Sequence, residues 1–183
     1  MIARIAAGRR SDIGLVNWTL LHIGGRLAGS GPPNLFSTMA RNRSLFRAWL
    51  LFASNLMPFG GLPRRETELV ILRTAALNNC EYEKIHHRRL AQRAGISAEE
   101  TQRVIDLDLD GWSPRERAQL AATDQLHRDR NLDERTWHEL RQHLDEPAAI
   151  EFLLLAGHYT MLATFINTLG IALDHDVREL QQA

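Results

Sequence analysis

The sequence predicts an all-α fold, and three observations carry that prediction. Apolar side chains recur at helical spacing along most of the 183 residues, and no segment shows the alternation of apolar and polar residues that is typical of strands. Two Ser-x-x-Glu capping boxes, which begin helices, stand at Ser97–Glu100 and Ser113–Glu116. Prolines and glycines fall between the apolar stretches, where helices are expected to end. We therefore expect a single-domain helical bundle.

The chain divides into an N-terminal segment, 1–33, and a helical domain, 34–183. We place the division at the loop Gly29–Pro33, because a Gly-Ser-Gly-Pro-Pro run cannot continue a helix. Before this loop, an apolar stretch covers Ser11–Ile23. After it, apolar residues recur at helical spacing from Leu35 to about Met57, which predicts one helix there.

The rest of the chain is predicted as a succession of helices with clear start and stop signals. Pro63 suits the first turn of a helix, since its missing N–H needs no partner there. The stretch before Pro63 is a candidate for a semi-independent lobe, although it is too short to be a domain. Gly95 stands at the C′ position of a later helix. The expected helices are Pro63–Asn78, Cys80–Ala94, a short one from Ser97, Ser113–Arg128, Asp133–Leu144 and a long one opened by Pro147.

Composition and charge exclude several classes of protein. The 22 Lys and Arg residues balance the 22 Asp and Glu residues, whereas a nucleic-acid-binding protein normally carries a basic excess. The one cysteine, Cys80, cannot form an internal disulfide. The N-terminus lacks the order of basic and then apolar residues that marks a secretory signal. We therefore expect a cytoplasmic protein that has no nucleic-acid partner.

The segment Phe152–Leu173 contains no Asp, Glu, Lys or Arg and is long enough to span a bilayer. However, it includes polar residues such as His158 and Asn167, and no basic cluster follows it. The other helices also need a central apolar partner for their own apolar faces. We favour a buried core helix over a membrane span and expect no membrane partner.

The helix expected over Cys80–Ala94 carries the side chains best suited to chemistry. At helical spacing, Cys80, Glu83 and His87 share its apolar stripe. A carboxylate and an imidazole in such a place are costly unless they are paired. Burial raises the pKa of a carboxyl group and lowers that of a histidine, which suits general acid–base catalysis near neutral pH. The alternative interpretation is an ordinary i,i+4 pair at a partly exposed surface.

The segment Glu66–Ala75, followed by Asn79–His87, resembles the carboxymuconolactone decarboxylase family, which includes alkyl hydroperoxidase D. In that family a glutamate on one helix precedes a Cys-x-x-Cys-x-x-x-His motif at the start of the next. Glu68 stands twelve residues before Cys80, which matches the first cysteine, and His87 matches the histidine. The resemblance implies the oligomeric helical bundle of the alkyl hydroperoxidase D-like type.

The chain departs from this motif at one position. Glu83 occupies the place of the second cysteine, so a peroxidase cycle that ends in a disulfide cannot close within one subunit. The decarboxylase branch lacks the cysteine pair, and a carboxylate–histidine site is closer to its chemistry. The segment Gly157–Gly170 also resembles the closing helix of the family, and the resemblance covers about 34–173.

The resemblance implies a cofactor-independent acid–base enzyme, a lyase that acts on a small organic acid or lactone. Its catalytic residues would be His87 as proton donor or acceptor, Glu83 as its partner or as a second acid, and Glu68 as the orienting carboxylate. One alternative is an antioxidant of the alkylhydroperoxidase or peroxiredoxin kind that uses Cys80 with an external thiol. Another is a non-catalytic oligomeric scaffold.

Three further residues are candidates for contact with a small-molecule substrate. They are Tyr82, Lys84 and His158. Lys84 at a pocket rim would steer an anionic substrate, although a solvated helix face also explains it. His158 stands seven residues after Glu151, so a structural hydrogen bond between the two is the alternative to a substrate contact.

We expect no metal and no cofactor. Glu68, Glu83 and His87 include suitable ligand types for zinc or iron, but a fourth ligand is missing. The resemblance also implies a homotrimer or homohexamer. The apolar run Trp49–Phe52 agrees with that expectation, because it adds more apolar surface than one small core needs.

Overall fold

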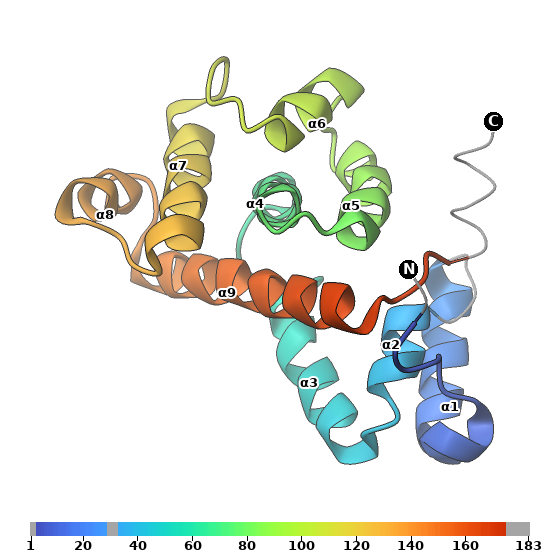
Figure 1. Cartoon of the computed structure of the whole chain (residues 1–183). Helices are drawn as coiled ribbons and strands as arrows, with labels where there is room; N and C mark the ends of the chain where they lie inside the picture. The colour runs from blue at the N-terminus through green and yellow to red at the C-terminus, as the bar shows by residue number, and fades with distance from the viewer. Residues whose placement is uncertain (1–2, 29–32, 175–183) are drawn as a thin grey trace. The chain divides into compact units, whose positions relative to one another are not determined.

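The computed structural model describes residues 3–28 and 33–174, and within these ranges it contains nine α-helices and no strand (Figure 1). The all-α prediction is confirmed. In chain order the helices are α1 (Arg10–Ala28), α2 (Asn34–Met39), α3 (Arg43–Leu56), α4 (Arg64–Leu77), α5 (Glu81–Arg93), α6 (Ala98–Ile105), α7 (Pro114–Asp129), α8 (Glu134–Arg141) and α9 (Glu146–Leu169).

The chain forms two compact units, and each has its own apolar core. The first, here called the N-terminal unit, comprises Met1–Asn55 with Ile166–Ala183, and the second, the core unit, comprises Leu56–Phe165. The first of the two segments in the N-terminal unit ends at Asn55, near the limit of the lobe expected before Pro63. The division into a segment 1–33 and a domain 34–183 stays a prediction.

The N-terminal unit packs α1, α2 and α3 around Ile13, Leu21, Ala40 and Phe46. The single helix expected from Leu35 to Met57 is wrong, because the chain breaks between α2 and α3. There the side-chain oxygen of Asn42 accepts a hydrogen bond from the N–H of Leu45, which gives α3 its own start. Apolar spacing alone does not detect such a local cap.

The core unit is built around α4, which Figure 1 shows end on, with α5, α6 and α7 around it. Every residue of α4 from Glu66 to Ala75 is buried, so this part of the helix has no solvent face. Its apolar residues pack with those of α5, α6 and α7 in one cluster. The members of that cluster are Leu69, Leu72, Ala91, Ile96, Val104, Trp112 and Leu120.

The capping signals read from the sequence are confirmed. Ser97 and Ser113 each form a complete capping box with the glutamate three residues later, and Asp133 caps α8 through the N–H of Thr136. Gly95 takes a positive φ of 81° after α5, which favours glycine. Local chemistry therefore fixes where these helices begin and end.

Helix α9 is long and apolar enough to cross a membrane by length and composition, and half of its most apolar window is buried in the protein. Within the core unit, its residues Phe152, Leu155 and Ala163 are buried. The side chain of Glu151 accepts hydrogen bonds from the N–H groups of Gly61 and Leu62, which joins α9 to the loop before α4. This burial agrees with the core helix expected from the sequence.

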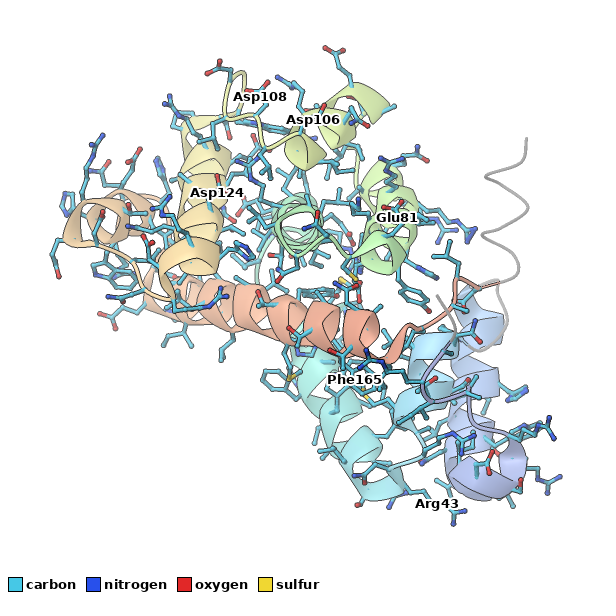
Figure 2. The ribbon with its side chains drawn as sticks, in the orientation of Figure 1. Arg43, Glu81, Asp106, Asp108, Asp124 and Phe165 are labelled. Atoms are coloured by element: carbon cyan, nitrogen blue, oxygen red, sulfur yellow. The ribbon has the colours of Figure 1, made fainter. Side chains whose placement is uncertain are left out.

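A buried arginine on α4 holds the connection between α6 and α7. The side chain of Arg73 is fully buried. It makes a two-pronged ion pair with Asp124 of α7, with both N···O distances 2.6 Å, and Figure 2 labels Asp124 on that helix. Its remaining N–H groups donate to three carbonyl oxygens, those of Val104, Leu107 and Asp108. One guanidinium thereby satisfies backbone groups at the end of α6 and in the loop after it.

We expect Arg73→Met to lower the free energy of unfolding by about 3–5 kcal/mol, because it removes one partner of a buried ion pair and leaves the other without a counter-charge. Arg128→Met is the control, since Arg128 is exposed and its ion pair is with its neighbour Asp129. Its effect should stay within about 0.5 kcal/mol. Urea unfolding of both variants measures the difference, and equal losses would contradict this role for Arg73.

Candidate active site

The turn between α4 and α5 brings the predicted residues into contact. Asn79 adopts a left-handed conformation with φ of 50°. The N–H of Asn79 donates to the carbonyl of Ala76, and the N–H of Cys80 donates to that of Ala75, which is the pattern of a Schellman motif. Cys80 then serves as the N-cap residue of α5. This tight reversal lays α5 against α4.

Glu68, His87 and Glu83 form one buried cluster; helical spacing predicts the nearness of Glu83 and His87, and the family resemblance implies the part of Glu68. The Nδ1 atom of His87 lies 2.7 Å from Oε2 of Glu68, and its Nε2 atom lies 3.2 Å from Oε2 of Glu83. All three side chains are buried. The imidazole therefore bridges a carboxylate of α4 and a carboxylate of its own helix. The surface i,i+4 pair that was the alternative is wrong, because neither partner is exposed.

Arg64 completes the charge balance of the cluster. Its Nη2 atom lies 2.8 Å from Oε1 of Glu68, near enough for an ion pair although the angles are not those of a hydrogen bond. With His87 protonated, two positive and two negative groups balance. Sequence analysis missed Arg64, although its place four residues before Glu68 was the available signal.

The structure reverses the expected direction of the His87 pKa. Burial works to lower this pKa, as expected, but the hydrogen bonds and negative charges of Glu68 and Glu83 outweigh burial and raise it to about 9. His87 is therefore an imidazolium at neutral pH. The prediction of a lowered pKa was wrong because it included burial and omitted a second carboxylate from another helix.

Glu83 has one carboxylate oxygen available for a ligand. Its Oε2 atom faces His87, whereas its Oε1 atom is buried and has no hydrogen-bond partner in the part of the chain that the structure describes. A buried acceptor without a partner is costly, and such atoms often mark a place where a ligand or a water molecule binds.

Tyr159 of α9 lies against the cluster and was missed by sequence analysis. Its ring meets the His87 ring edge to face, with the ring centres 5.2 Å apart, and its hydroxyl group contacts the sulfur of Met57 at 3.8 Å. Burial, followed by the negative charges of Glu83 and Glu68, raises its pKa, so it is a neutral phenol. The available signal in the sequence was its place directly after His158, on the helix that was expected to be buried.

The three residues proposed for substrate contact have different surroundings. Tyr82 is buried and stacks on His86, with the ring centres 4.2 Å apart. Lys84 pairs with the exposed Glu81 at 2.7 Å, and Figure 2 labels Glu81 on α5. His158 is buried, and burial lowers its pKa to about 4, against the opposing charge of Glu83. His158 is thus a neutral imidazole near the cluster.

The hydrogen bond between His158 and Glu151 that was the structural alternative stays a prediction. The oxygens of Glu151 accept hydrogen bonds from the N–H groups of Gly61 and Leu62.

Cys80 is buried, and its pKa is raised to about 11. Burial is the largest cause, while the N–H of Glu83 opposes it and the charge of Glu83 adds to it. The side chain is therefore a thiol, and only a very small fraction is thiolate at neutral pH.

No group of three His, Cys, Asp or Glu side chains is arranged for a metal within residues 3–28 and 33–174. Within the cluster, each ring nitrogen of His87 faces a carboxylate oxygen at hydrogen-bond distance.

Comparison with known proteins agrees with this fold. The carboxymuconolactone decarboxylase family model matches residues 43–125. A peroxidase-related protein from Ralstonia eutropha JMP134, with an alkylhydroperoxidase AhpD core, superposes with a TM-score of 0.85 at 22% identity, over 97% of this chain and 95% of that one. A peroxidase-related protein from Silicibacter sp. TM1040 gives 0.83 at 14% identity, with 93% of each chain covered.

A third similar structure is the debrominase Bmp8, in a cysteine-to-alanine form bound to 2,3,4-tribromopyrrole. It superposes with a TM-score of 0.81 at 20% identity, over all of this chain and 97% of that one. At these identities the likeness establishes the fold. No curated protein sequence matches this chain.

The raised pKa of His87 predicts how stability depends on pH. The imidazolium is favoured in the folded protein, so its contribution is complete below the ordinary value of 6.5 and is lost as the pH rises through about 9. We expect the free energy of unfolding to fall by roughly 3 kcal/mol at most between pH 6.5 and 9. Urea unfolding across this range measures it.

The variant His87→Gln is the control for this dependence. It should be less stable than the natural chain at pH 6.5, because two buried carboxylates lose their cation, and it should show little further loss up to pH 9. A parallel decline in both proteins would assign the titration to another group.

Proposed function

We propose that this chain belongs to the carboxymuconolactone decarboxylase family and is a cofactor-independent acid–base enzyme, because the family model matches residues 43–125 and the fold is AhpD-like. Its reaction is that of a lyase, and its substrate is a small organic acid or lactone. Glu83 exchanges the proton with the substrate, His87 supplies that proton, and Glu68 orients His87.

The observation that carries this proposal is the unpartnered oxygen of Glu83 beside a protonated His87. Both nitrogens of His87 are engaged by carboxylates, so the imidazolium cannot reach a substrate without giving up one of those bonds. Glu83 has Oε2 on His87 and Oε1 free. The proton passes from Nε2 of His87 to Oε2 of Glu83, and rotation of the carboxyl group then turns this proton toward the substrate on the side of the free oxygen, which makes a short relay.

In the proposed step, the bond between the carboxylate carbon and its neighbour breaks and carbon dioxide leaves. The electron pair of that bond moves into a conjugated carbonyl of the substrate and forms an enolate. Glu83 gives the enolate carbon a proton that came from His87, and the cluster then regains a proton from water. The cluster is buried, so the interactions between its charges are strong. Its two positive and two negative groups balance, so the proton transfer from His87 to Glu83 takes place in a cluster without net charge.

The state of Cys80 favours acid–base chemistry over the antioxidant alternative. Peroxide reacts with a thiolate, whereas the Cys80 thiol has a raised pKa and a carboxylate, Glu83, three residues away. A redox cycle at this position would also need an external thiol.

We expect Glu83→Gln to reduce the rate of carbon dioxide release from a carboxylated lactone by about a hundredfold or more, the usual scale for loss of a general acid. Glu81→Gln is the matched control, because it removes a carboxylate from the exposed side of the same helix. It should keep the rate within about twofold. A rate unchanged in Glu83→Gln, with a lowered melting temperature, would indicate a purely structural cluster and favour the scaffold alternative.

A second comparison separates acid–base from thiol chemistry. Cys80→Ser should cost about 1 kcal/mol or less in stability and leave the lyase rate within about threefold. If instead Cys80→Ser abolishes a peroxide-dependent turnover measured with an external thiol, while the fold persists, the antioxidant function takes precedence.

We also propose that the protein assembles as a homotrimer or homohexamer. The support within the core unit is one face of α9, where Ile150, Leu154 and Met161 are exposed although they are large and apolar. In the N-terminal unit, Leu51 and Phe52 are exposed as expected, whereas Trp49 and Leu50 pack against the apolar core of that unit. Apolar surface of this extent is typical of a contact between subunits.

We expect light scattering at micromolar concentration to give the mass of a trimer or hexamer, and Leu154→Lys to lower that mass, because a charge buried in an apolar contact is costly. Glu134→Lys on α8, at an exposed polar position, serves as the control. A monomer mass for the natural chain would refute the proposal.

A further inference from the structure

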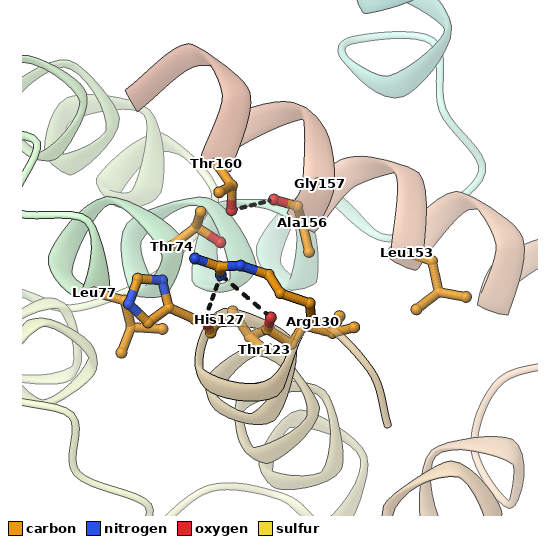
Figure 3. Close-up of a pocket in the computed structure, with 10 residues that line it drawn as sticks. Thr74, Leu77, Thr123, His127, Arg130, Leu153, Ala156, Gly157 and Thr160 are labelled. Carbon is orange, nitrogen blue, oxygen red and sulfur yellow. Dashed lines mark hydrogen bonds between the residues drawn. The ribbon is translucent and has the colours of Figure 1, made fainter. Parts of the chain in front are cut away.

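The core unit holds a pocket that the Glu68–His87–Glu83 cluster does not line. It lies between α4, α7 and α9 and has a volume of about 190 Å³ (Figure 3). An engineered protein cavity of about 150 Å³ binds benzene, so this pocket has room for a ligand of one small ring.

The walls of the pocket are mainly apolar. Leu77 comes from α4, Leu126 from α7, and Leu153 and Ala156 from α9. Two of the threonines beside them, Thr123 and Thr160, donate their hydroxyl protons to carbonyls of their own helices, so these groups are already satisfied. The greater part of the pocket thus suits an apolar body.

Polar atoms without partners converge at one side of the pocket. The hydroxyl oxygen of Thr74 is buried, on a residue that is 2% exposed, and has no hydrogen-bond partner among the described residues. The Nδ1 atom of His127 is buried and unpartnered as well. Figure 3 shows both side chains beside the guanidinium of Arg130. Two unpaired buried groups facing one pocket indicate that a ligand completes their hydrogen bonds.

Arg130 supplies a positive charge at the same place. It ends α7 in a left-handed conformation, and its Nη1 atom donates to the carbonyls of Leu126 and His127. A guanidinium has further N–H donors on Nε and Nη2. None of the described residues that line the pocket is acidic, and the nearby Asp124 is paired with Arg73. The polar side of the pocket therefore favours an anion.

We propose that this pocket binds a small carboxylate with an apolar body, of the size and chemistry of an aromatic acid such as benzoate. The ring lies among Leu77, Leu126 and Leu153, and the carboxylate meets Arg130 and the hydroxyl group of Thr74. The site is separate from the acid–base cluster, so it does not depend on the proposed reaction.

Binding is tested on the full chain by isothermal titration calorimetry with benzoate and with benzyl alcohol, which has the same ring and no charge. We expect saturable binding of benzoate and at least tenfold weaker binding of the alcohol, because charge-assisted hydrogen bonds are lost. Equal affinity for the two compounds, or no binding of benzoate, would overturn the proposal.

Two variants and one control locate the interaction. Arg130→Gln should weaken benzoate binding by about tenfold, and Thr74→Val, which keeps the side-chain shape, by about threefold. Arg128→Gln removes the same charge two residues earlier on an exposed side chain that pairs with Asp129, and it should leave the affinity unchanged. Equal losses in Arg128→Gln and Arg130→Gln would mean that only the general charge matters, which refutes a built site.

The anomalous signal of iodine in crystals soaked with 4-iodobenzoate gives the position directly. We expect the iodine near Leu153 and the carboxylate near Arg130. Density beside Glu83 instead would overturn the separate site and assign the acid to the proposed reaction centre. The activity of Glu83→Gln and the affinity of Arg130→Gln are independent measurements, so either proposal can fail alone.

Discussion

Every charge buried along α4 has to be paired, and the core unit is arranged around that requirement. Glu66 accepts hydrogen bonds from Arg115 and Gln119 of α7. Glu68 pairs with His87 of α5, and Arg73 pairs with Asp124 of α7. An unpaired charge in this position would cost several kcal/mol, more than the packing of any one side chain returns. The neighbouring helices are thus held to α4 in a fixed register by polar contacts as well as by apolar packing.

The same constraint sets the protonation of the reaction centre. A histidine buried alone would be neutral, but two carboxylates placed on its two nitrogens keep the proton on His87 at neutral pH. Arg64 at the end of the row offsets the second negative charge. Proton affinity at this site is therefore a property of four side chains from two helices, and no single residue determines it.

Much of the fold and the identity of the cluster could be predicted from the sequence because their signals are local. Ser97 and Ser113 specify helix starts through residues three positions away, and the spacing of Glu83 and His87 places both on one face of a helix. The sign of the His87 pKa shift could not be predicted, because it depends on how closely Glu68 of another helix approaches. The burial of Arg73 was equally hidden, since its partners are up to 51 positions away in the chain.

Because Cys80 is buried and protonated, it does not interfere with the labelling of other positions by thiol reagents. It is the one cysteine of the chain, and with a pKa of about 11 it offers almost no thiolate to an alkylating reagent at neutral pH. A cysteine introduced at an exposed position, such as that of Glu99, would have an ordinary thiol and would react far faster. The natural chain is therefore already a suitable background for attaching a single spectroscopic probe.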